Sequence, residues 1–237
     1  MEPKICPKPF DDEDFAFQIK WDGTRILAHI GETGAQLFNR KNNRRTAQYP
    51  EVVEALSDLA PQGTIFDGEM IALNGGVPDF RHVMRRDRST DITTISHLRR
   101  IIPVTYVIFD MLLAMGEDLT TNPFHERDEM LKFLLRTQDP VVITDTFREN
   151  GTGLFEVTKN RDLEGIVAKK WDSPYILGKK SDYWLKIKHR RHLVGIAGGY
   201  SEEGCTVRSL YLGLYEGNDL IFVGKASSGI TEDTARD

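Results

Sequence analysis

The chain has 237 residues, of which 40% are hydrophobic and 28% charged, and this is the composition of an ordinary globular protein. The formal net charge of −5 argues against a nucleic-acid-binding protein that is basic throughout, but it leaves room for basic patches. Two cysteines far apart in sequence, Cys6 and Cys205, exclude a disulfide framework and a metal knuckle, while no apolar run approaches the roughly 20 residues that span a bilayer. The N-terminus lacks the apolar core of a signal peptide, so we expect a cytoplasmic protein without membrane association.

The first part of the chain predicts short strands and two helices. Alternating apolar residues predict strands at residues 15–20, 25–30, 36–39 and 65–73. Turns at Asp22–Gly23 and at residues 31–35 join the first three strands, which indicates an antiparallel meander. A helix begins at Tyr49-Pro50-Glu51, since proline suits a first helical turn, and residues 80–86 predict a weaker helix.

The second part alternates strands and helices and then changes character. We expect strands at 104–113, 141–144, 165–169 and 184–188, and helices at 126–135 and 154–159. After Arg191 the predicted elements are all strands, at 193–199, 209–215 and 220–223, joined by glycine-rich turns. This pattern is typical of the start of a small β-barrel, but three or four strands would leave an exposed edge.

A lysine at the end of the first predicted strand is the first candidate for chemistry. Residues 20–25 read Lys-Trp-Asp-Gly-Thr-Arg, so that Lys20 precedes a tight turn and Arg25 follows it. A lysine amine acts as a nucleophile when its surroundings lower its pKa. The hexapeptide alone fits a charged strand end before a turn equally well.

Two acids stand in or beside apolar strands. Glu69 lies within Phe-Asp-Gly-Glu-Met-Ile, and Glu164 begins Glu-Gly-Ile-Val-Ala-Lys. A carboxylate is costly to bury unless it is paired or binds a metal, and Mg²⁺ prefers such oxygen ligands. Taken alone, each acid fits a salt bridge with a nearby lysine, or a solvent-facing position, better than a metal site.

Lysines and one aromatic residue complete the candidate site. Alternation puts Lys186 and Lys188 on the same strand face, where two like charges favour a bound polyphosphate, and Lys169 also lies in a strand. The alternative is the solvent-facing side of an edge strand. Phe109 offers a ring for stacking a nucleobase, although an aromatic residue in an apolar strand usually belongs to the core.

Basic residues cluster in two stretches that a nucleic acid could contact. Each stretch fits a solvated protein face equally well. The first comprises Arg81, Arg85, Arg86, Arg88, Arg99 and Arg100, and the second Lys179, Lys180, Lys186, Lys188, Arg190 and Arg191.

Taken in order, these segments resemble the ATP-dependent DNA ligases, within the covalent nucleotidyltransferases that also include RNA ligases and mRNA capping enzymes. The resemblance runs from about Phe15 to Lys188 and is most similar to small bacterial, archaeal or phage ligases, including end-joining ligase domains. It is specific because six blocks occur in order. The blocks are residues 20–25, 38–40 with Thr46 and 49–51, 66–69, 106–110, 164–169 and 184–188.

The resemblance implies a role for each matching residue. Lys20 would attack the α-phosphate of ATP and form a lysyl-AMP, the AMP would pass to a 5′-phosphate at a nick in double-stranded DNA, and the 3′-hydroxyl would displace it. Gln18 and Ile19 would contact the adenine, on which Phe109 would stack, while Glu69 and Glu164 would bind Mg²⁺ or Mn²⁺ or orient the ribose. The residues expected at the ribose and phosphates are Arg25, Arg40, Lys169, Lys186 and Lys188.

Two departures from the family pattern qualify this picture. Many relatives have glutamate where this chain has Gln18, whose amide oxygen can still accept a hydrogen bond from the adenine amino group. The second departure is C-terminal. Residues 189–237 resemble only the first strands of the OB-fold that follows in DNA ligases, and no basic motif occurs near Ile230–Asp233.

The predicted architecture is therefore α+β. Residues 1–188 form a nucleotidyltransferase (adenylation) domain of antiparallel sheets flanked by helices, and residues 189–237 form the N-terminal part of a truncated OB-fold. The chain is then a fragment or a shortened protein with impaired self-adenylylation, and we expect a monomer. The alternatives are an RNA ligase, a capping-type guanylyltransferase and a catalytically impaired nucleic-acid-binding fragment, although residues 173–184 resemble DNA ligases more than capping enzymes.

Overall fold

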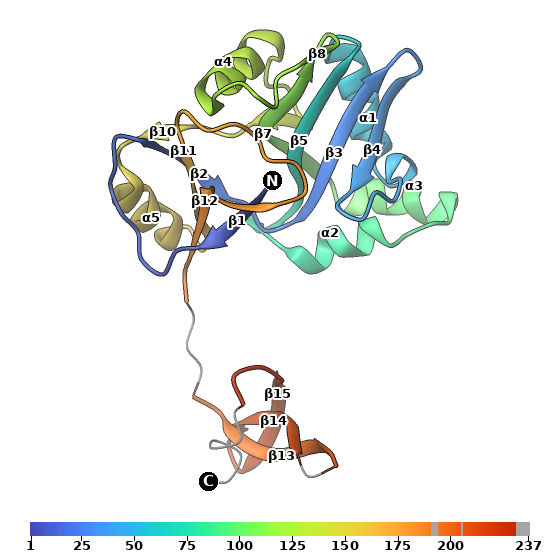
Figure 1. Ribbon diagram of the computed structural model, residues 1–237. Helices are drawn as coiled ribbons and strands as arrows, with labels where there is room; N and C mark the ends of the chain where they lie inside the picture. The colour runs from blue at the N-terminus through green and yellow to red at the C-terminus, as the bar shows by residue number, and fades with distance from the viewer. Residues whose placement is uncertain (191–193, 205, 231–237) are drawn as a thin grey trace. The chain divides into compact units, whose positions relative to one another are not determined.

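The computed structural model describes residues 1–190, 194–204 and 206–230, and the chain forms two compact units, Met1–His189 and Arg190–Asp237 (Figure 1). The first unit is α+β, as predicted, and contains two sheets with helices packed on them. The predicted domain boundary after residue 188 is one residue from the boundary between the units. The assignment of the second unit to an OB-fold remains a prediction.

The larger sheet of the first unit has its strands in the order β4-β3-β5-β7-β8, with β6 paired to β5 and β9 paired to β7. The two long central strands are mostly buried because both of their faces are apolar, and helices cover one face. Its strands are β3 (Thr24–Gly31), β4 (Gly34–Asn39), β5 (Thr64–Asn74), β6 (Val77–Pro78), β7 (Val104–Ala114), β8 (Glu117–Asp118) and β9 (Val141–Ile143).

The smaller sheet has the order β1-β12-β11-β2-β10 and brings together segments that are far apart in sequence. Its edge strand β1 runs parallel to β12, whereas its other pairs are antiparallel. Its strands are β1 (Glu2–Ile5), β2 (Phe15–Lys20), β10 (Phe147–Arg148), β11 (Gly165–Lys170) and β12 (Lys180–Lys188).

Helices cover the sheets and enclose separate cores. Helices α1 (Pro50–Leu59), α2 (Phe80–Asp87) and α4 (Phe124–Leu134) pack on the larger sheet, α3 (Ile92–Ile101) packs on α2, and α5 (Gly151–Asn160) packs on the smaller sheet (Figure 1). Val52, Leu56 and Leu131 belong to the core of the larger sheet, which also includes many strand residues. A separate cluster of Leu112, Tyr175 and Trp184 packs with residues of both sheets and holds them together.

The antiparallel meander predicted for the first three strands is wrong. Strands β3 and β4 do pair, but β2 pairs with β11 and β10 in the other sheet. The turn at Asp22–Gly23 carries the chain from one sheet to the other rather than reversing it within one sheet. A Cβ at Gly23 would lie 2.1 Å from the carbonyl oxygen of Met70, so the turn packs directly on β5 and requires glycine.

Several elements of the first unit were not predicted, and the longest of them are α3 and β1. Helix α3 has weak helical propensity because its first turn contains β-branched residues, but Asp91 caps it by accepting a hydrogen bond from the Thr94 N–H at 2.7 Å. Strand β1 is short and half exposed, so it has no alternating pattern of its own, and pairing with β12 makes it a strand. The other predicted helices and strands of this unit are present, with ends shifted by a few residues.

The second unit contains an antiparallel sheet in the order β13-β14-β15. Its strands are β13 (Ile196–Glu203), β14 (Thr206–Glu216) and β15 (Asp219–Ala226). The strands predicted at 209–215 and 220–223 lie within β14 and β15. The strand predicted at 193–199 begins outside the described residues and overlaps β13, and residues 231–233 of the region searched for a basic motif also lie outside them.

Candidate active site

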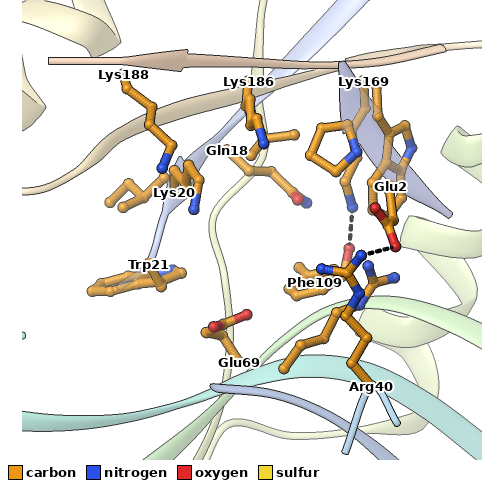
Figure 2. Close-up of a pocket in the computed structure, with 15 residues that line it drawn as sticks. Glu2, Gln18, Lys20, Trp21, Arg40, Glu69, Phe109, Lys169, Lys186 and Lys188 are labelled. Carbon is orange, nitrogen blue, oxygen red and sulfur yellow. Dashed lines mark hydrogen bonds and ion pairs between the residues drawn. The ribbon is translucent and has the colours of Figure 1, made fainter. Parts of the chain in front are cut away.

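A pocket with a volume of about 210 Å³ lies between the two sheets of the first unit. Figure 2 shows lysine side chains of the smaller sheet directed into it from one side, with Glu69 and Arg40 on the other. The lining residues are Glu2, Pro3, Gln18, Ile19, Lys20, Trp21, Arg25, Arg40, Glu69, Phe109, Val167, Lys169, Trp184, Lys186 and Lys188. Every predicted site residue except Glu164 therefore lines one cavity.

The register of the smaller sheet brings Lys20 and Lys188 together. Both residues are paired with Gly165, which lies in the strand between them. The Lys20 Nζ donates to Glu164 Oε2 at 2.5 Å, and Lys188 forms an ion pair with the other carboxylate oxygen. Glu164 thus holds two lysines, from the strands on either side of β11, at the edge of the pocket.

Gly165 makes this arrangement possible for a backbone reason. Its φ of +146° lies in the region that favours glycine, and a Cβ there would lie 2.1 Å from the carbonyl oxygen of Ile187. Any side chain at this position would push β11 and β12 apart. The glycine after Glu164 is therefore a structural requirement of the lysine cluster.

A second cross-strand row adds positive charge inside the pocket. Gln18 is paired with Val167, and Val167 with Lys186. Burial lowers the pKa of Lys186, and the neighbouring Lys188 and Lys20 lower it further. Three lysines around one cavity repel one another unless an anion lies between them, so the arrangement fits a polyphosphate.

Glu69 faces these lysines from β5. It forms no hydrogen bond or ion pair with the described residues, and burial raises the pKa of its carboxyl group to about 8, an effect that Lys20 and Arg25 only partly offset. A carboxyl group in this situation is stabilised by a cation or a hydroxyl donor. No group of three His, Cys, Asp or Glu residues in the described part of the chain is arranged so that it could hold a metal ion. The carboxylates of Glu69 and Glu164 are still a suitable set for Mg²⁺, because this ion is commonly held by one or two carboxylates together with substrate phosphates.

The two predicted arginines, Arg25 and Arg40, differ in how many of their N–H groups remain available to a ligand. The Arg25 guanidinium donates to both oxygens of Asp67 at 2.9 and 2.6 Å, to the Met1 carbonyl at 2.7 Å and to the Tyr175 hydroxyl at 2.7 Å. Only one of its five N–H groups is left for a ligand. Arg40 is 69% exposed and forms one ion pair, with Glu2 at 2.5 Å, so it is the more available of the two (Figure 2).

Lys169 and Phe109 lie together at the inner end of the pocket. The buried Lys169 Nζ donates to the Phe109 carbonyl at 2.6 Å, lies 3.6 Å from Asp110 Oδ2 and is 4.1 Å from the ring centre of Trp184 (Figure 2). Burial lowers the pKa of Lys169 to about 8, although Asp110 opposes the shift. The Phe109 ring meets Trp184 edge to face at 5.9 Å, so the ring is held at the pocket wall.

Five lining residues were not predicted. Trp21 lies within the first motif, and Trp184 has the same alternation as Lys186 and Lys188, so their sequence positions carried a usable signal. Val167 could have been placed by the same alternation with Lys169. Glu2 and Pro3 carried no such signal, because they reach the pocket only through the pairing of β1 with β12.

The basic stretches are only partly available to a partner. Arg86 is fully buried and donates to Glu51 and to the carbonyls of Gln48 and Ile102, so it stabilises the fold. Arg99 forms an ion pair with Glu54 at 2.6 Å. The residues of these stretches that are exposed are Arg81, Arg85, Arg88, Arg100, Lys179, Lys180, Lys188 and Arg190, while Arg191 lies outside the described residues.

Known protein sequences are similar to this chain over most of its length. Residues 4–188 match the family model described as ATP dependent DNA ligase domain. The chain is 32% identical over 197 residues to the SPbeta prophage-derived DNA ligase-like protein LigB of Bacillus subtilis, covering 83% of this chain and 69% of that protein. It is 31% identical to the multifunctional non-homologous end joining protein LigD of Mycolicibacterium smegmatis, covering 93% of this chain but only 28% of LigD.

A solved structure described as mycobacterial DNA ligase D complexed with ATP and MES has a TM-score of 0.66 and 25% identity, and the match covers 99% of this chain and 73% of that one. A Lig E DNA ligase structure shares the fold at a TM-score of 0.65 and 18% identity, covering 100% of this chain and 88% of that one. No helix in the described part of the chain is long and apolar enough to cross a membrane.

Proposed function

Since this chain belongs to the ATP-dependent DNA ligase family, we propose that it seals nicks in double-stranded DNA, with Lys20 as the residue that carries AMP. The single observation that best supports the proposal is the pocket in which Lys20 meets Lys186, Lys188, Lys169 and Glu69. The name of the ATP-bound mycobacterial structure supports ATP as the nucleotide.

In the first step the Lys20 Nζ attacks the α-phosphorus of ATP. A nitrogen–phosphorus bond forms, the bond to the β-phosphate oxygen breaks, and pyrophosphate leaves. Lys20 must lose a proton to attack, and Glu164, whose Oε2 accepts from Nζ at 2.5 Å, is the acceptor within reach. Lys186 and Lys188 stabilise the charge that develops on the phosphate oxygens.

The later steps use the same cations. An oxygen of the DNA 5′-phosphate attacks the phosphorus of the bound AMP, the nitrogen–phosphorus bond breaks, and Lys20 recovers its proton. The 3′-hydroxyl oxygen then attacks the phosphorus of the 5′-phosphate and loses its proton to solvent water, while the phosphoanhydride bond to AMP breaks and AMP leaves. Glu69 would hold a divalent cation, which supplies positive charge to the phosphate oxygens when it is bound, and Glu164 would join it by exchanging one of its two lysine partners for the cation.

The proposal is tested by incubating the protein with Mg²⁺ and α-labelled ATP or GTP. We expect covalent labelling by ATP that is lost in Lys20→Ala, and we expect the labelled protein to join a nicked duplex. Lys4→Ala is a matched control, because Lys4 pairs with Asp182 on the surface and does not line the pocket. It should label like the wild type.

Other outcomes separate the alternatives. Labelling by GTP would indicate a capping-type enzyme, and joining of RNA but not DNA would indicate an RNA ligase. A complete lack of labelling, even with Mn²⁺, would contradict self-adenylylation by this chain and favour a protein that only binds nucleic acid.

A further inference from the structure

A chain of three hydrogen bonds leads from the surface to the buried side chain of Gln18. Lys132 Nζ donates to Asp128 Oδ2 at 2.5 Å, Thr146 Oγ1 donates to Asp128 Oδ1 at 3.0 Å, and Gln18 Nε2 donates to Thr146 Oγ1 at 3.0 Å. Asp128 lies on α4 and Thr146 on the connection between β9 and β10. Neither Asp128 nor Thr146 lines the pocket, whereas Gln18 does.

The protons of these three hydrogen bonds can be arranged in only one way. The carboxylate of Asp128 accepts from both neighbours, so the single hydroxyl proton of Thr146 points at Asp128. The Thr146 oxygen can then only accept from Gln18. Gln18 must therefore turn its NH₂ group to Thr146, which leaves its Oε1 on the other side of the amide.

That oxygen has no hydrogen-bond partner among the described residues, although Gln18 is only 2% exposed. The oxygen is not among the fully buried polar atoms that lack a partner, so it keeps access to the pocket that Gln18 lines, where a ligand can donate to it in place of water. The exocyclic amino group of adenine is such a donor. Guanine carries an oxygen at the same ring position, and two acceptors facing each other repel.

We propose that Thr146 and Asp128 are positioning residues that fix the orientation of the Gln18 amide and thereby make the pocket select adenine over guanine. This inference rests on the proposed function only in taking the ligand to be a purine nucleotide. If the amide were free to rotate by 180°, its NH₂ group would face the pocket and donate a hydrogen bond to the guanine oxygen, so guanine would bind as well. The selectivity therefore depends on residues that never touch the nucleotide.

The test measures dissociation constants of ATP and GTP by calorimetry in the Lys20→Ala background, where no covalent product forms. Thr146→Val removes the acceptor for the Gln18 NH₂ group, and we expect the preference for ATP over GTP to fall about tenfold. Thr146→Ser keeps the hydroxyl and should keep the preference. Thr144→Val is a matched control, since the Thr144 hydroxyl lies in the same connection but accepts from Trp21 Nε1 at 3.2 Å; it should also keep the preference.

A second background separates orientation from general damage. In Gln18→Glu both side-chain oxygens are acceptors, so rotation changes nothing and adenine stays preferred. Adding Thr146→Val to Gln18→Glu should then alter the ATP-to-GTP preference by less than twofold. A purely structural role of Thr146 would instead give the same loss in both backgrounds.

The outcomes distinguish this inference from the proposed function. A wild-type chain that forms no covalent adduct, but whose binding preference falls in Thr146→Val, would contradict the ligase proposal and support the positioning role. A ligating chain in which Thr146→Val keeps the full preference would overturn the positioning role. Equal binding of ATP and GTP by the Lys20→Ala protein, or binding of neither, would overturn it as well.

Discussion

Lys169 is a charged group that the fold buries almost completely, with 1% of its side chain exposed. Its polar contacts are the Phe109 carbonyl and the more distant Asp110, and the rings of Trp184, Phe124 and Phe109 lie around it, so the ammonium group is only partly compensated. Arg127 forms two shorter hydrogen bonds with the same Asp110, at 2.8 and 3.0 Å. Lys169 is therefore the weaker partner of Asp110, which explains why the lowering of the Lys169 pKa by burial outweighs the raising effect of Asp110.

This shift predicts a pH dependence of stability. The pKa of Lys169 is about 8 in the folded chain and 10.5 in its unshifted reference state. Between these values the unfolded chain holds a proton that the folded chain has lost, so the Lys169 contribution to the free energy of unfolding rises with pH. In urea unfolding, we expect the free energy of unfolding of the wild type, relative to that of Lys169→Met, to rise by roughly 1 to 2 kcal/mol between pH 8 and pH 10. A stability difference between the two proteins that stays constant with pH would contradict the lowered pKa of Lys169.

At the level of elements, β11 is the strand on which the arrangement of the site depends. It pairs with β2 on one side and β12 on the other, and these two neighbours supply Gln18, Lys20, Lys186 and Lys188. The lysine cluster therefore depends on how closely three backbones approach at Gly165.

Replacing this glycine gives a direct test. Gly165→Ala combines an unfavourable positive φ with a backbone clash, and we expect a loss of roughly 2 to 4 kcal/mol in the free energy of unfolding. Gly31→Ala, at the end of β3, is the control, since its Cβ would meet no atom within 4 Å. We expect that control to change stability by less than about 1 kcal/mol. Equal effects of the two substitutions in chemical denaturation would show that the approach of the strands at Gly165 is not tight.

At the scale of the whole molecule, the charge is unevenly distributed. The net charge is −5, yet four lysines of one sheet line the pocket, and α2 and its C-terminal cap expose Arg81, Arg85 and Arg88. A protein of negative net charge can still bind a polyanion when its cations are concentrated at one surface, since most distant charges are screened at physiological salt. The exposed arginines of α2 are therefore a proposed contact for the DNA backbone.

Salt dependence tests this proposed contact. Each phosphate contact releases counterions, so replacing Arg81, Arg85 and Arg88 together by glutamine should reduce the slope of log affinity against log salt by up to about 3. The measurement is nicked-duplex binding by fluorescence anisotropy over a range of salt concentrations. A control that removes three exposed charges from other elements, Arg136, Lys159 and Arg161, should leave the slope nearly unchanged. Equal losses in both variants would indicate a non-specific effect of net charge.

Most local elements of the first unit and the chemical groups of the site could be predicted from the amino-acid sequence alone. Strand periodicity depends on nearest neighbours along the chain, so β2, β5, β7 and β11 were predictable, and the order of the motifs indicated the ligase family. The sequence could not determine which strands pair, because pairing depends on contacts between distant residues. The assignment of β2 to the first meander was therefore wrong, and β1 and α3 were missed.

Which of the candidate residues can contact a ligand depends on the folded structure. It committed Arg25 to Asp67 and buried Arg86 against Glu51, while it left Arg40 and Glu69 facing the pocket. It also connected Gln18 to Asp128, 110 positions away in the chain, through one threonine hydroxyl. Residue type sets which hydrogen bonds are possible, but the neighbours that folding brings within 3 Å decide which of them form.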